Sequence, residues 1–207
     1  MAPGVYFLPQ DQPHWLGAIY AMQKQTLLPV HPGGLTALSL QGMSHYIRLG
    51  QENFYVFATA KTKLPKWFID YDWQQTLKSY ATSFLPNDLS LIEYKSQNLV
   101  VNISSPERAI LECVYLTPNR IDLIECYNLM EGLVNLRPHV IQELLESCKS
   151  IKVKRLFLYM AEKAGHSWLK YLDQSKMELG FGDRLVVKNG VYIKRYGITV
   201  PKELNNL

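Results

Sequence analysis

The chain has 207 residues and a formal net charge of +4, with 47% apolar, 12% aromatic and 19% charged residues. This length supports one large domain or two small ones, and the composition excludes a disordered chain. No apolar run approaches the roughly 18–20 residues of a membrane span, and the mean hydropathy is −0.10, which excludes a membrane-spanning protein.

The N-terminus lacks the basic stretch followed by an apolar run that marks a secretory signal, so we expect a cytoplasmic protein. Cysteine usage agrees with that compartment. Cys113, Cys126 and Cys148 are odd in number and show no C-x-x-C spacing, so we expect three small core residues rather than disulfides or metal ligands.

The sequence of the first half of the chain predicts helices around a sheet. Gly4–Leu8 has the pattern of a short strand at the end of an earlier element, His14–Leu28 has helical spacing, and the pair Gly33 and Gly34 opens a short apolar helix that stops at Gly42. Residues 61–68 are expected to form an irregular loop. Four strands are expected, at Phe54–Ala58, Leu77–Phe84, Leu89–Tyr94 and Leu99–Ile103, the last two joined by a turn at 95–98.

From Ser105 the apolar period changes to that of a helix. Ser105 is suited to cap it, Pro106 to occupy its first position and Glu107 to its positive end. Further helices are predicted at Ile121–Leu133, Pro138–Cys148 and Ile151–Ala164, with an extra turn at Ser167–Leu172.

The chain ends with apolar runs at 185–188 and 191–194 around Asn189 and Gly190, a strong hairpin signal. The predicted fold class is therefore α+β: a mixed sheet of about four strands, a helical region and a C-terminal β-hairpin. We expect residues 13–104 to form the sheet half and 105–207 the helical half of one compact domain.

Catalytic motifs are absent from the sequence: it holds no G-x-S-x-G, no phosphate-binding P-loop and no H-E-x-x-H. Gly180-Phe181-Gly182 lacks the third glycine of a dinucleotide site and is expected to be an ordinary turn. Two enzyme hypotheses stay open, and both need a divalent metal. One is a nuclease site that uses Asp88, Glu93 and Lys95, and the other is a nucleotidyltransferase-like site that uses the glycine pair with Asp70 and Asp72.

The charge is distributed unevenly. Residues 1–139 carry a net charge of −1, and residues 140–207 a net charge of +5. Helical spacing places Lys152, Arg155 and Lys163 on one edge of a helix, and the hairpin adds further cations. The candidate phosphate contacts are Lys149, Lys152, Arg155, Lys163, Lys188, Lys194 and Arg195.

The alternative explanation of these cations is a solvated, solubilising face. If they bind phosphates, replacing Lys152, Arg155, Lys194 and Arg195 with glutamine should flatten the salt dependence of DNA binding and leave thermal stability nearly unchanged.

Four segments of the sequence carry a recognisable pattern in this order: Trp15–Gln23, Gly33–Gly42, Ser105–Glu112 and the run from Leu129 to Tyr196. Together they resemble the AbiEi family of antitoxins and transcriptional regulators of type IV toxin–antitoxin and abortive-infection systems. We expect structural roles for their marked residues: a tight turn at the glycine pair, an i, i+4 pair of Arg108 with Glu112, and support from Thr36 and Glu107.

The resemblance implies a bacterial regulator that is not an enzyme and uses no cofactor or metal. It implies an N-terminal winged helix-turn-helix that binds promoter DNA, of which residues 1–12 are expected to be only the end, so that DNA binding by this chain alone would be weak. Its functional partner would be an AbiEii-like nucleotidyltransferase toxin, which it would counteract without forming a stable complex. No membrane partner is expected. A metal-dependent nuclease or nucleotidyltransferase, or a purely protein-binding module, is the alternative.

Overall fold

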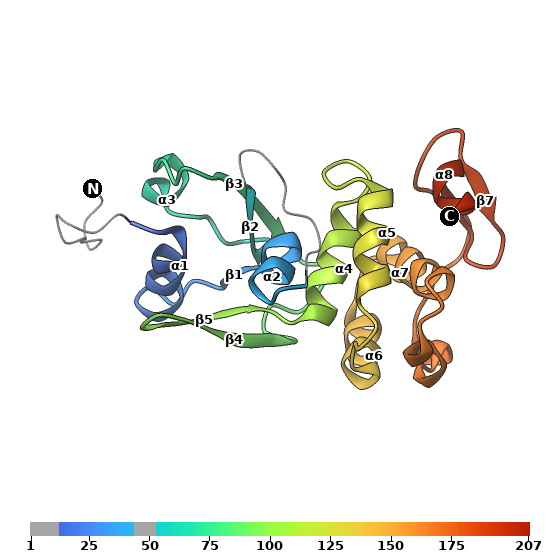
Figure 1. Cartoon of the computed structure of the whole chain (residues 1–207), viewed down its shortest axis with the longest axis horizontal. Helices are drawn as coiled ribbons and strands as arrows, with labels where there is room; N and C mark the ends of the chain where they lie inside the picture. The colour runs from blue at the N-terminus through green and yellow to red at the C-terminus, as the bar shows by residue number, and fades with distance from the viewer. Residues whose placement is uncertain (1–12, 44–52) are drawn as a thin grey trace.

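The structure, a computed structural model, describes residues 13–43 and 53–207. Strands and helices of the N-terminal half come first, a group of helices occupies the middle of the chain, and a small sheet follows near the C-terminus (Figure 1). This arrangement confirms the α+β class. The strand expected at Gly4–Leu8 lies outside the described residues.

The N-terminal half contains one three-stranded sheet and a separate hairpin. Its elements are α1 (Trp15–Lys24), β1 (Val30–Pro32), α2 (Gly34–Leu40), β2 (Asn53–Thr59), α3 (Lys66–Asp70), β3 (Thr76–Thr82), β4 (Leu91–Ser96) and β5 (Leu99–Ser104). The sheet order is β1-β2-β3, with β1 antiparallel and β3 parallel to β2, and β4 pairs antiparallel with β5. The apolar run of β2 is buried because the strand lies in the centre of its sheet.

The expected single sheet of about four strands is wrong. Within the described residues, β4 and β5 pair with each other and join no other strand, and the third member of the main sheet is β1. A three-residue strand that ends in Pro32 carries too little pattern to be predicted from sequence. Part of the expected irregular loop at 61–68 is also helical, because α3 begins at Lys66.

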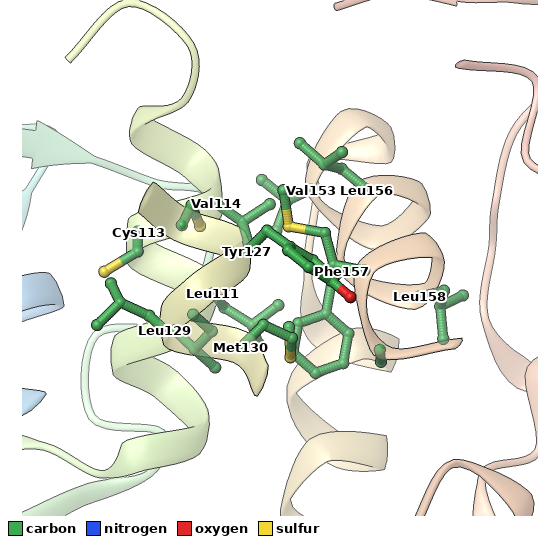
Figure 2. Packing of buried hydrophobic residues seen from close by; sticks show 14 of the residues in the cluster. Leu111, Cys113, Val114, Tyr127, Leu129, Met130, Val153, Leu156, Phe157 and Leu158 are labelled. Carbon is green, nitrogen blue, oxygen red and sulfur yellow. The ribbon is translucent and has the colours of Figure 1, made fainter. Parts of the chain in front are cut away.

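The middle of the chain is formed by four helices. They are α4 (Pro106–Leu116), α5 (Leu123–Gly132), α6 (Pro138–Ser147) and α7 (Ile151–Lys163). Ser105 caps α4 as predicted, because its side chain accepts a hydrogen bond from the Arg108 N–H. Side chains of α4, α5 and α7 meet in one apolar core, with Leu111, Met130 and Phe157 in contact range of the same cluster (Figure 2).

The cysteines behave as predicted. All three are free and buried, and Cys113 and Cys126 belong to the core between the helices. A second cluster of buried apolar side chains lies in the sheet half, around Trp15, Ile19 and Phe54. In the described part of the chain, no helix is both long enough and apolar enough to cross a bilayer.

A small sheet ends the fold. Two short 3-10 helices, Ser167–Tyr171 and Gln174–Lys176, lead to β6 (Arg184–Leu185), β7 (Val191–Ile193), β8 (Ile198–Val200) and α8 (Lys202–Asn206). The order β6-β8-β7 corrects the expected pairing across Asn189 and Gly190, because β8 lies between the two runs. The hairpin that forms is β7 with β8, and burial of Ile198 and Val200 holds β8 in the centre.

Candidate functional site

The motif residues of the two halves meet at the buried carboxylate of Glu112 on α4. One oxygen, Oε1, accepts hydrogen bonds from His31 Nε2 at 3.0 Å and Arg108 Nε at 2.8 Å. The other oxygen, Oε2, accepts from the Gly34 N–H and the Ser104 hydroxyl, both at 2.8 Å. Four donors from β1, α2, β5 and α4 therefore satisfy one buried charge.

The glycine pair is required by this junction. A side chain at Gly33 would overlap the Glu112 carboxylate and would lie 2.6 Å from the Phe57 ring. Gly34 has a φ of +51°, a conformation that favours glycine. The pair thus lets the backbone approach a buried anion and turn into α2, which agrees with the structural role expected for it.

The electrostatics of the junction keep Glu112 ionised. Burial raises the pKa of the Glu112 carboxyl, but the hydrogen bonds from His31 and Arg108 and the charge of Arg108 outweigh it and hold the pKa below its usual value. Burial lowers the pKa of His31. Among the described residues the His31 Nδ1 atom is buried with no hydrogen-bond partner, so the geometry also favours neutral His31 that donates from Nε2.

The remaining motif residues extend the junction to neighbouring elements. Arg108 Nη1 donates to the carbonyls of Pro86 at 2.7 Å and Leu89 at 2.6 Å. Glu107 accepts from Arg137 Nε and Nη2, each at 2.9 Å, which joins α4 to the start of α6. The i, i+4 pair of Arg108 with Glu112 is confirmed.

Thr36 supports the same junction from α2. Its hydroxyl accepts the Tyr55 N–H at 2.7 Å, and the Gly33 N–H donates to the Tyr55 carbonyl at 3.1 Å. The start of α2 is thereby fastened to β2 as well as to α4. These contacts tie the sheet half to the helical half, and the motif side chains that make them are buried.

The seven candidate phosphate contacts divide by exposure. Lys149, Lys188, Lys194 and Arg195 are exposed, whereas Lys152 and Lys163 are partly buried. Lys152 Nζ donates to the carbonyls of Tyr115 at 2.9 Å and Thr117 at 2.6 Å, and burial lowers its pKa. Lys163 Nζ donates to the Asn205 carbonyl at 3.2 Å. Arg195 forms an ion pair with Glu162.

Arg155 corrects the helical-wheel interpretation. The expected edge of positive charge does not form there, because Arg155 is only 6% exposed and its guanidinium points into the protein. Four of its N–H groups bind backbone carbonyls, so it faces no solvent ligand. The wheel gives only the direction of a Cβ, and a long side chain beside the apolar stripe can turn inward.

These four bonds fasten two loops together. Arg155 Nε donates to the Leu179 carbonyl at 2.8 Å and Nη2 to Gly180 at 2.9 Å, while Nη1 donates to Gly182 at 2.6 Å and Gly197 at 3.2 Å. We call residues 179–183 and 194–197 the Arg155 tip. One buried cation thus holds the loop before β6 against the turn between β7 and β8.

The charged residues of the two enzyme hypotheses lie on the surface, whereas the glycine pair lies at the buried junction. Asp70, Asp72, Asp88, Glu93 and Lys95 are all exposed. Glu93 and Lys95 alternate with half-buried neighbours along β4, which is the pattern of an ordinary strand. Residues 13–43 and 53–207 contain no group of three or more His, Cys, Asp or Glu side chains placed to hold a metal ion.

The comparisons with known proteins agree with this architecture. The fold resembles that of the RV2827C protein from Mycobacterium tuberculosis, with a TM-score of 0.64 and 10% identity over 91% of this chain and 68% of that one. No curated protein matches the sequence significantly.

Two family descriptions cover nearly the whole sequence. Residues 1–49 match the AbiEi antitoxin N-terminal domain, and residues 51–201 match the transcriptional regulator, AbiEi antitoxin, of type IV toxin–antitoxin systems. The second match alone covers more than half of the chain, so the chain belongs to the AbiEi antitoxin family of type IV toxin–antitoxin transcriptional regulators, which are not enzymes.

Proposed function

We propose that this AbiEi-family regulator binds the promoter DNA of its own operon, and that exposed cations of its C-terminal third hold the DNA phosphates. The observation that carries the proposal is the charge asymmetry, net +5 in residues 140–207 against −1 in the rest. Lys188, Lys194 and Arg195 extend from the loops of one small sheet into solvent. Loop cations of this kind suit contacts with a phosphate backbone.

These contacts would position DNA without reading its sequence. In the family, an N-terminal winged helix-turn-helix is expected to recognise the DNA sequence. The C-terminal cations would add to it an affinity that depends on salt. Arg155 supports this surface from inside and makes no phosphate contact. The ion pair of Arg195 with Glu162 is exposed, so exchanging it for a phosphate costs little.

The test compares two triple variants. Lys188, Lys194 and Arg195 are replaced with glutamine in one, and the exposed Lys61, Lys63 and Lys66 of the sheet half in the other. Affinity for a labelled duplex taken from the DNA before its coding region is measured by anisotropy over a range of salt. The first variant should make the slope of log K against log salt shallower by about 2.7, since each lost phosphate contact removes about 0.9.

The control variant removes the same charge from the other half and should leave the slope near that of the wild type. Equal slopes in all three proteins would contradict a role for the C-terminal cations and would mark them as a solvated face. A shallower slope in both variants to the same degree would show a general charge effect instead.

As an antitoxin, the chain would counteract an AbiEii-like nucleotidyltransferase toxin in the cytoplasm without forming a stable complex with it. Growth of cells that express the neighbouring toxin gene, with and without this chain on a second plasmid, tests the first half of this proposal. Rescue by the chain is expected. Co-purification of the two proteins from the rescued cells would contradict the absence of a complex.

A further inference from the structure

The Arg155 tip carries an aromatic side chain that is almost fully exposed to solvent. Phe181 is 96% exposed and stands between Gly180 and Gly182, whose φ angles are +65° and +71°. A single exposed apolar residue is ordinary on a protein surface. Here, however, the small sheet beside it adds Leu185 at 68% exposure and Tyr192 at 49%.

The sheet register places these neighbours on one face. Leu185 of β6 and Tyr192 of β7 are both register partners of Thr199 in the central strand β8. Side chains at one register position lie on the same side of a sheet. The Tyr192 hydroxyl donates to Asp183 Oδ1 at 2.6 Å, so its ring reaches over β8 toward the Phe181 loop.

Hydrogen bonds from Arg155 hold the Phe181 loop in place. The carbonyls on both sides of Phe181, those of Gly180 and Gly182, accept from the same buried guanidinium. Each glycine adopts a φ that other residues rarely adopt and so allows a sharp path of the backbone, and the hydrogen bonds from Arg155 hold that path. Buried Arg155 therefore fastens a loop from which Phe181 faces solvent, and a loop that is fixed before binding loses less entropy on binding.

The surroundings of Phe181 are positively charged. Residues 179–201 carry Arg184, Lys188, Lys194 and Arg195 against the single acid Asp183. Arg155 Nη1 binds the Gly197 carbonyl together with that of Gly182, so the turn with Lys194 and Arg195 lies beside the Phe181 loop. A partner that offers both negative charge and flat apolar faces fits this combination, and DNA offers both.

We infer that Phe181 is a wedge that inserts between stacked base pairs of the duplex whose phosphates the neighbouring cations hold. The inference rests on the proposed function and assigns a new contact to it. Apolar side chains that unstack a base step kink the duplex, and the bent DNA then meets more of the protein surface. Phe181 would thus add affinity that does not depend on salt, because it releases no counterion.

The experiment uses the full chain and a duplex from the DNA before its coding region, with a donor and an acceptor dye at its two ends. Affinity over a range of salt and energy transfer in the bound state are measured for Phe181→Ala and Phe181→Leu. Tyr171→Ala is the matched control, because Tyr171 is also an exposed aromatic, 66% accessible, but lies outside the tip. Thermal melts confirm that each variant folds, as expected for replacements of exposed side chains.

We expect Phe181→Ala to weaken binding about tenfold at every salt concentration, with an unchanged salt slope and loss of the DNA bend. Phe181→Leu should keep most of the affinity and the bend, since leucine also serves as a wedge. Tyr171→Ala should match the wild type.

Two results would overturn the wedge. One is wild-type affinity and bending in Phe181→Ala. If the triple variant of Lys188, Lys194 and Arg195 still flattens the salt slope in that case, the proposed DNA binding stands without the wedge. The other is tighter binding of the matching single strand than of the duplex, lost in Phe181→Ala, which would show stacking on unpaired bases. If the wild type binds no DNA at all, the proposed function itself fails.

Discussion

The sharpest prediction concerns Arg155. Replacing it with glutamine removes a buried guanidinium that donates four hydrogen bonds to carbonyls of Leu179, Gly180, Gly182 and Gly197. A hydrogen bond from a charged group contributes about 1.5–3 kcal/mol, but carbonyls of surface loops can bind water once released, so the full sum is not lost. We estimate a loss of about 3 kcal/mol in the free energy of unfolding, or about 6–12 °C in melting temperature for a chain of this size.

Circular dichroism melts of Arg155→Gln and Arg184→Gln measure this loss. Arg184 is exposed and adjoins the tip, so its replacement should change stability by less than about 0.5 kcal/mol. If Arg155 were a phosphate contact on a solvated edge, its loss would alter DNA binding and leave the melt unchanged. A melting temperature equal to that of the wild type would therefore refute the stabilising role of Arg155 at the Arg155 tip and restore the interpretation of Arg155 as a surface cation.

Two further predictions concern the Glu112 junction. Glu112→Gln should lower the free energy of unfolding in urea by about 3–5 kcal/mol, because it leaves the buried Arg108 cation without its partner. A loss no larger than that of Glu93→Gln, a control at an exposed position, would contradict this prediction. Stability should also fall as the pH falls below 6.5, because burial lowers the pKa of His31 in the folded state and the unfolded chain then binds more protons. His31→Gln should reduce this upper part of the pH dependence and leave the part due to His14, whose pKa burial also lowers. The lowered pKa of Glu112 keeps the loss of stability below about pH 4.5. Urea midpoints at a series of pH values test both statements.

Local signals predicted local structure well. The Ser105 and Pro106 pair fixed the start of α4, and the spacing of Arg108 and Glu112 predicted their contact, because the partners lie within one or two helical turns. The glycine pair predicted a tight turn for the same reason. Sequence reasoning missed His31 and Ser104 as donors to Glu112, although His31 stands two residues before the glycines and could have been noticed as a polar residue among apolar ones.

Long-range partners account for the rest. His31 and Glu112 are 81 residues apart, and the carbonyls that bind Arg155 lie 24 to 42 residues after it. The Asn-Gly signal at 189 and 190 describes a turn that two adjacent strands could share. It carries no information about β8, whose Ile198 and Val200 are fully buried in the centre of the sheet.

The inward position of Arg155 also limits how strongly salt can affect DNA binding. If all seven candidate cations held phosphates, the slope of log K against log salt would be about −6.3, at about 0.9 for each contact. Arg155 is buried, and Lys152 and Lys163 already donate to backbone carbonyls. The exposed candidates are Lys149, Lys188, Lys194 and Arg195, which together support a contribution of about −3.6. A steeper contribution from this half of the chain would require phosphate contacts by other exposed residues such as Arg184, and the difference between the two values is large enough for a salt titration to resolve.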